Sequence, residues 1–175
     1  MKKFSATIIL LTAFLVLTPL FGTEDEKTAW QWLDFSDAQP LALQQNKHLI
    51  INFYSIGCYW CRKMDKDTYG NQEIIAYLDS NYIGAKVNNG SNRKVTWREQ
   101  TLTERELARY FNVRGTPFTA FVDTSGQIVG SAPGYLPPTT FAPLLKYVGG
   151  YWYKELTFQE FIASESAIHK TEGKP

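Results

Sequence analysis

Cysteine and histidine are scarce in this sequence, with two of each among 175 residues. The cysteines are Cys58 and Cys61, and the histidines, His48 and His169, lie far from them in the sequence. Tetrahedral zinc takes four ligands and there is no second Cys-x-x-Cys pair, so we expect no metal site. A disulfide between cysteines three positions apart closes a small loop and adds little stability. The pair is therefore better explained by a reactive role than by a stabilising one.

The sequence also lacks a large excess of positive or negative charge. The net charge is +1 and no block of lysine and arginine occurs, so there is no electrostatic reason to expect binding of nucleic acid. No carboxylate pair or Ser/His/Asp set is recognisable, and a hydrolase has no support. The sequence has no internal repeats, and its composition of 44% hydrophobic and 15% aromatic residues is typical of one globular domain.

The first 22 residues have the pattern of an export signal. Two lysines near the start precede an almost entirely apolar run over residues 4–17. We therefore expect a signal peptide over 1–22, a polar linker over 23–29, and a protein that is periplasmic or otherwise exported. The residues ahead of the cleavage position are large, so an uncleaved segment that anchors the protein in a membrane is the alternative.

Hydrophobic periodicity and turn residues predict alternating strands and helices. The clearest strand is 48–55, which is almost continuously apolar, as a buried central strand should be. Residues 88–102 are polar and are expected to form a loop, which either shapes partner choice or is a solvated insertion. Further strands are expected at 82–87, 117–122 and 127–131, and helices at 36–46, 58–68, after 71, at 103–112 and 138–148, and after 157. This order predicts an α/β fold with a mixed central β-sheet and helices on both faces.

The Cys58-Tyr59-Trp60-Cys61 motif falls where the strand at 48–55 gives way to a helix. At a helix N-terminus, unpaired N–H groups and the helix dipole favour the thiolate, which is the form that attacks disulfides. Arg62 and Lys63 add positive charge nearby. Cys61, one helical turn later, is expected to be less exposed and to resolve a mixed disulfide on Cys58. Half a zinc site, an inert disulfide and two buried thiols are the alternatives.

Thr116-Pro117 precedes another apolar strand. Proline is tolerated at the start of a strand, where its missing N–H is not needed. The functional alternative is a cis proline whose neighbouring backbone faces the thiols and pairs with an extended substrate; only a bond before proline adopts the cis form at small cost.

Taken in order, the strand, the Cys-x-x-Cys helix and Thr116-Pro117 resemble the thioredoxin superfamily over residues 30–162. More closely, the chain is similar to exported thioredoxin-related proteins associated with sulfur oxidation and cytochrome maturation. The resemblance implies a thioredoxin fold, with 163–175 left as a polar tail. It also implies that Cys58 is the nucleophile, Cys61 the resolving thiol and Pro117 a cis proline, with Thr116 offering its backbone to substrate. The redox-active disulfide then replaces a cofactor, and a membrane thiol-electron carrier supplies electrons.

The sequence departs from the common thioredoxin pattern at several positions. Tyr59-Trp60 stands between the cysteines instead of Gly-Pro, and Gly57 replaces a tryptophan. Asn52 stands where many thioredoxins bury an aspartate, and an amide cannot take a proton. Lys86 is therefore expected to lack a carboxylate partner and to point to solvent. On this pattern, Cys61 loses its proton to water or to substrate sulfur.

Tyr59 and Trp60 are expected either to form a contact surface for a protein substrate or, for Trp60, to fold back over the helix. We expect an exported thiol–disulfide oxidoreductase, acting as a monomer, that reduces protein disulfides. The alternatives are a non-enzymatic binding or chaperone module and a disulfide oxidant or isomerase, because the direction depends on a redox potential that the sequence does not give.

Overall fold

The computed structural model describes residues 29–172, so the predicted signal peptide and most of the linker lie outside the described residues. The strands are β1 (His48–Tyr54), β2 (Tyr82–Asn88), β3 (Lys94–Trp97), β4 (Gln100–Thr103), β5 (Phe118–Val122) and β6 (Ile128–Pro133). The helices are α1 (Phe35–Gln44), α2 (Tyr59–Asp67), α3 (Gln72–Asn81), α4 (Glu104–Tyr110), α5 (Pro138–Gly149) and α6 (Phe158–Glu172), with a 3-10 turn at Trp152–Lys154. None of the helices within residues 29–172 is both long enough and apolar enough to cross a membrane.

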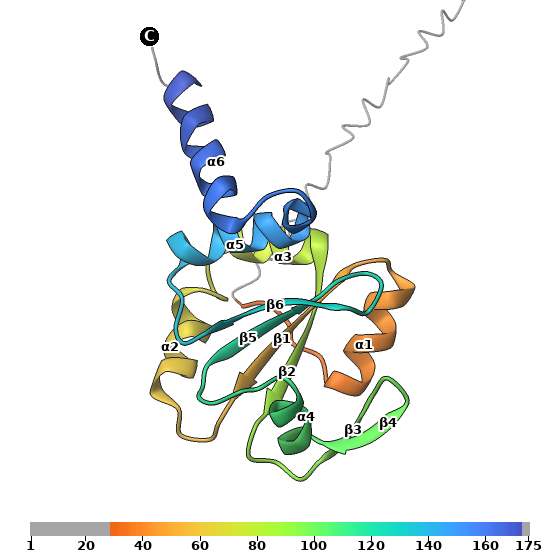
Figure 1. The fold of residues 1–175 in the computed structure, drawn as a ribbon. Helices are drawn as coiled ribbons and strands as arrows, with labels where there is room; N and C mark the ends of the chain where they lie inside the picture. Colours follow the sequence, from red (N-terminus) through yellow and green to blue (C-terminus); the bar gives the residue numbers. More distant parts are fainter. Residues whose placement is uncertain (1–28, 173–175) are drawn as a thin grey trace, which may run out of the picture.

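Four of the strands form the central sheet, in the order β2-β1-β5-β6. β1 pairs in parallel with β2 and antiparallel with β5, and β5 pairs antiparallel with β6. Figure 1 shows helices packed against this sheet from both sides. The prediction of a mixed sheet between two layers of helices is therefore confirmed.

Alternate side chains of β1 enter two separate cores, because successive residues of a strand point to opposite faces. Leu49, Ile51 and Phe53 pack with residues of α1 and α4. Ile50 packs with residues of α2, α3 and α5 on the other face. Asn52 shares the face of Ile50 and is also buried. The Cys58–Cys61 motif at the start of α2 thus lies over a face that contains a buried amide.

β3 and β4 form a hairpin where the sequence predicted a loop over 88–102. That prediction was wrong for the hairpin residues, because polar neighbours obscured a period-two pattern. Val95 and Trp97 are buried between exposed residues and join the core beneath α1 and α4. Arg98 and Glu99 turn the chain with φ values of 49° and 66°, the left-handed backbone that tight two-residue hairpins require.

The ends of several helices differ from the prediction for local reasons. α1 begins one residue early, with Asp34 at its N-cap position; the Asp34 side chain makes no cap hydrogen bond and pairs instead with Arg93. The helix predicted over 103–112 is confirmed in α4, which begins with a capping box formed by Thr103 and Glu106. α6 crosses the boundary expected at residue 162, and Figure 1 shows it extending away from the sheet.

Candidate functional site

The two cysteines form a disulfide between β1 and α2, with an S–S distance of 2.09 Å. The turn before it contains Gly57 at φ 81°, a left-handed conformation that strains other residues. Cys58 is the N-cap of α2, and its sulfur accepts a hydrogen bond from the Cys61 N–H at 3.0 Å. A sulfur in that position also meets the positive end of the helix dipole, so the arrangement favours a Cys58 thiolate after reduction.

Exposure distinguishes the two sulfurs as the sequence predicted. Cys61 is 5% exposed, whereas Cys58 is only half-buried. Of the two basic residues that follow, Arg62 is exposed. Lys63 bonds the Asp67 carboxylate at 2.5 Å, and this hydrogen bond raises the pKa of Lys63. Cys58 is therefore the more accessible of the two cysteines, with Cys61 buried behind it.

Ser55, which the sequence analysis did not single out, connects the disulfide to the proline segment. Its carbonyl accepts the Cys58 N–H at 3.2 Å, and its hydroxyl hydrogen-bonds with the Thr116 hydroxyl at 2.8 Å. The Thr116-Pro117 peptide bond is cis, as expected. Because the Ser55–Thr116 contact joins segments 61 residues apart, no local sequence signal marks it.

A hollow of about 350 Å³ lies along the proline segment. Arg114, Gly115, Thr116 and Pro117 line it on one side, and Gly134 lines it on the other. Pro117 also accepts the Gly134 N–H with its carbonyl at 2.8 Å. The hollow therefore follows the segment that the sequence predicted to offer its backbone, with Thr116 and Pro117 among its lining residues.

Three exposed apolar side chains surround the disulfide, and we call Ile56, Tyr59 and Trp60 the apolar rim. Their exposed fractions are 87%, 63% and 51%. The Trp60 ring contacts the rings of Tyr59 and Tyr135, with centroid distances of 5.3 Å and 5.5 Å. Trp60 thus rests on neighbouring rings and keeps about half of its surface open to solvent, and its role as a contact surface stays a prediction.

Beneath α2, a polar row crosses the sheet. Asn52 of β1 lies opposite Lys86 of β2 and Thr119 of β5. The Tyr69 hydroxyl hydrogen-bonds with Thr119 at 3.2 Å. Burial raises the pKa of Tyr69, and hydrogen bonds with Thr119 and Asn52 oppose that shift. The Asn52 Oδ1 atom is buried and has no hydrogen-bond partner.

Lys86 does not point to solvent without a partner, and that prediction was wrong. Its ammonium bonds the Asp65 Oδ2 atom at 2.6 Å and lies over the rings of Trp32 and Tyr54. Asp65 was missed because its partner is on another element, 21 residues away. The sequence signal that could have identified Asp65 was its position four residues after Cys61, which places both residues on the same face of the helix.

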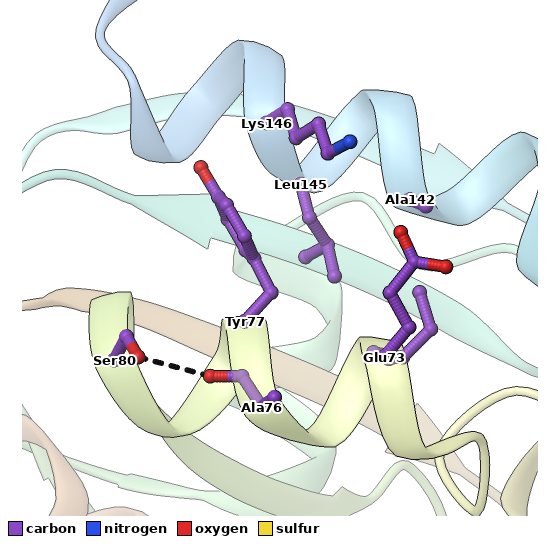
Figure 2. Close-up of a pocket in the computed structure, with 8 residues that line it drawn as sticks. Glu73, Ala76, Tyr77, Ser80, Ala142, Leu145 and Lys146 are labelled. Atoms are coloured by element: carbon purple, nitrogen blue, oxygen red, sulfur yellow. Dashed lines mark hydrogen bonds between the residues drawn. The ribbon is translucent and has the colours of Figure 1, made fainter.

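No three His, Cys, Asp or Glu side chains gather as a metal site would need among residues 29–172. A second hollow, of about 290 Å³, lies between α3 and α5. Figure 2 shows Tyr77 and Leu145 along it, with Glu73 and Lys146 near its edge. None of the residues that the sequence predicted for the redox site lines this hollow.

Comparison with known proteins decides the family. Residues 35–149 match the family profile of the thioredoxin-like domain. The chain belongs to the thioredoxin-like family. Its four-stranded sheet and flanking helices form a thioredoxin fold.

Among solved structures, this thioredoxin-like chain is similar to a thioredoxin-fold protein from Helicobacter pylori, with a TM-score of 0.64, 21% identity, and coverage of 71% of this chain and 87% of the other. It is also similar to a thioredoxin from Thermus thermophilus, with a TM-score of 0.56, 25% identity, and coverage of 69% and 87%. A curated relative, the chloroplastic thioredoxin-like protein HCF164 of Oryza sativa subsp. japonica, is 32% identical over 65% of this chain and 42% of its own length. The chain spans less than half the length of the curated relatives it matches.

Proposed function

We propose that this protein is an exported thiol–disulfide oxidoreductase that reduces disulfides of protein substrates. The observation that carries the proposal is the Cys58–Cys61 disulfide at the start of α2, with Cys58 at the N-cap and Cys61 buried behind it. Electrons are carried by this redox-active pair, so the reaction needs no bound cofactor.

Reduction proceeds in two exchanges. The Cys58 thiolate attacks one sulfur of the substrate disulfide, and the other substrate sulfur leaves as a thiolate that takes a proton from water. The Cys61 thiolate then attacks the Cys58 sulfur, which forms the Cys58–Cys61 bond and releases the second substrate sulfur. The substrate gains two electrons and the protein loses two.

The substrate is held by contacts on two sides of the disulfide. An extended segment of the substrate lies in the hollow beside Pro117 and forms hydrogen bonds with the backbone of Thr116. The hydrogen bond between the Ser55 and Thr116 hydroxyls holds this segment of the protein next to the turn that precedes Cys58. Apolar side chains of the substrate pack on the apolar rim. These contacts favour flexible or partly unfolded protein segments over small disulfides.

Continued turnover needs an electron source in an oxidising compartment. A membrane thiol-electron carrier that reduces the Cys58–Cys61 disulfide would meet this need, and the protein would work as a monomer at that surface. Export rests on the basic and apolar pattern of residues 1–22. Without such a carrier, the disulfide form would accumulate and the protein would act as an oxidant or isomerase.

Insulin reduction with dithiothreitol tests the proposal. We expect the wild-type protein to accelerate the precipitation of insulin chains and Cys58→Ser to fall to the rate of dithiothreitol alone, because the nucleophile is lost. Ser125→Ala, in the turn between β5 and β6, serves as a distant control and should keep wild-type activity. Equal rates for wild type and Cys58→Ser would refute the proposal.

A non-enzymatic binding or chaperone module is the second candidate, favoured by the exposed apolar rim. Such a module would keep its activity in Cys58→Ser and lose it when Ile56 and Trp60 are replaced by serine. Trapping with Cys61→Ser then identifies substrates, because that variant should hold them as mixed disulfides on Cys58. Trapping no protein in the native compartment would contradict the redox function.

A further inference from the structure

The second exchange of the proposed reaction needs a proton acceptor for Cys61. Only a thiolate attacks a disulfide, and Cys61 is 5% exposed, so water has little access to its proton. Asn52 is a buried polar residue of β1 on the face covered by α2, at the end of the strand nearer the cysteines. Its amide cannot accept a proton in place of a carboxylate. The acceptor must therefore come from another element.

Asp65 is placed for this role by the geometry of α2. Residues four apart on a helix have Cβ atoms about 5–6 Å apart on one face, and side chains lean toward the helix N-terminus. The Asp65 carboxylate is therefore directed toward the turn that carries Cys61. At that distance, a carboxylate reaches a thiol directly or through one water.

The two oxygens of Asp65 have different surroundings. Oδ2 takes the hydrogen bond from Lys86 at 2.6 Å, whereas Oδ1 is buried and has no hydrogen-bond partner. A buried acceptor without a partner is uncommon in folded proteins and calls for an explanation. The Asp65 side chain as a whole is 36% exposed, so a proton received on the carboxylate can pass on to water.

We propose that Asp65 accepts the proton of Cys61 during the second exchange, with Lys86 holding the carboxylate in position. This inference rests on the proposed reductase function. In the step, the proton moves from the Cys61 sulfur to the carboxylate, the Cys61 sulfur bonds the Cys58 sulfur, and the bond from Cys58 to substrate breaks. The substrate sulfur leaves with the electron pair, and Asp65 returns its proton to water. This acceptor replaces the water or substrate sulfur expected from the sequence.

Other charged and titratable groups surround the pair. Tyr54 lies against the Lys86 ammonium, and the charge of Asp65 acts on the buried Tyr69. On the outer side, Lys86 shares a polar hollow with Arg93 and Glu104, whose charges pair with each other at 2.7 Å. Lys86 is thus the cation that pairs with Asp65, whereas Arg93 pairs with Glu104.

A single-turnover reaction of the reduced full chain with 5,5′-dithiobis(2-nitrobenzoate) separates the two exchanges. Attack by Cys58 releases the first thionitrobenzoate, and attack by Cys61 on the resulting mixed disulfide releases the second. Because Cys58 and Cys61 are the only cysteines in the sequence, both signals come from this pair. Cys61→Ser should release only the first. Stopped-flow absorbance between about pH 6 and pH 9 gives a rate for each release.

We expect Asp65→Asn to slow the second release at least about tenfold near pH 7, the scale of general base catalysis, and to leave the first release within about twofold. The difference should close above about pH 8.5, where a free thiol ionises unaided. Asp65→Glu should keep the wild-type profile within about threefold. Asp67→Asn, on the same helix and also paired with a lysine, is the matched control and should behave as wild type.

Equal second-release rates in Asp65→Asn and wild type would overturn the inference. A loss by the same factor at every pH would also overturn it, because that is the signature of a structural defect. So would the same change of profile in Asp67→Asn. Any of these outcomes alongside normal insulin reduction refutes the role of Asp65 alone, whereas failure of the wild type to reduce insulin refutes the proposed function.

Discussion

Two buried polar residues, His48 and Asn52, project from the same face of β1, each 2% exposed. Each has one buried polar atom without a hydrogen-bond partner, Nε2 in His48 and Oδ1 in Asn52. The His48 ring is enclosed by aromatic rings, with centroids at 5.5 Å for Tyr82 and 4.6 Å for Tyr151. Asn52 instead lies in the polar row that leads to the Lys86–Asp65 ion pair.

The difference shows how one strand serves two purposes. At the His48 end, the polar ring is closed off by aromatic packing, and burial lowers the pKa of His48 so that the neutral ring is favoured. At the Asn52 end, a neutral amide lies under α2, and the ionised pair beside it is 26% and 36% exposed. The charged pair is thus kept near solvent at the redox end, whereas at the other end burial lowers the pKa of His48 more than Asp123 raises it, and Lys154 adds to the lowering.

The largest effect on stability is expected when one buried tyrosine hydroxyl is removed near each end of β1, and the two losses sharpen this comparison. Tyr69→Phe should lower the free energy of unfolding by about 2 kcal/mol, because both Thr119 and Asn52 lose a partner inside the protein. Tyr82→Phe should lower it by about 1 kcal/mol, because the two partners of its hydroxyl, the Leu145 carbonyl at 2.8 Å and the Gly149 N–H, both belong to α5 and keep helical partners. Urea unfolding followed by circular dichroism measures both. A larger loss in Tyr82→Phe would reverse our ranking of the two ends.

The His48 end should respond to pH. Burial holds the folded pKa of His48 below its ordinary 6.5, so the unfolded chain binds a proton that the folded chain refuses. The free energy of unfolding should therefore decrease as the pH falls below 6.5, with a slope from this group of at most about 1.4 kcal/mol per pH unit. Well above pH 6.5, His48 is neutral in both the folded and the unfolded chain and adds no pH dependence to the free energy of unfolding.

The matched variant for this prediction is His48→Phe, which keeps a ring among the aromatic neighbours. We expect its unfolding curves, compared with those of wild type between about pH 5 and pH 8, to lack the His48 part of the slope. If both proteins lose stability in parallel below pH 6.5, the His48 ring is not the source.

The smallest effect on stability is expected at the redox end, from Asp65→Asn. A partly exposed ion pair contributes about 0.2–1 kcal/mol, so the free energy of unfolding should fall by less than about 1 kcal/mol. The same variant is expected to slow thiol resolution strongly, which separates a chemical role from a structural one. A stability loss well above 1 kcal/mol in urea unfolding would indicate that the pair holds α2 in place.

Local signals in the sequence predicted much of this molecule. The apolar strand before Cys58, the helix that follows it and the helix that begins at 103 rest on short-range patterns, and each forms as expected. The cis bond before Pro117 was expected from the resemblance to the thioredoxin superfamily, because a proline at the start of a strand is by itself an ordinary structural feature. Taken in order with the family resemblance, these patterns predicted the fold class, whereas the separate roles of Cys58 and Cys61 stay predictions.

The features that the sequence did not reveal depend on contacts between distant elements. Lys86 meets Asp65 only because α2 lies across β2, and Ser55 meets Thr116 only after β5 has joined β1. The β3–β4 hairpin was hidden differently: four-residue strands with Val95 and Trp97 as the buried alternation are too short to stand out from a polar segment.

The position of Asp65 on α2 has a consequence for the modularity of the site. The attacking sulfur, the resolving sulfur and the proposed proton acceptor all lie within residues 58–65, a single stretch of chain. In a design that buries its acid on a neighbouring strand, the chemistry is divided between two elements that must be inherited together. Here the stretch could be transplanted as one segment into a related scaffold that already has the proline segment, with a lysine at the position facing Asp65 as the contact that the carboxylate requires.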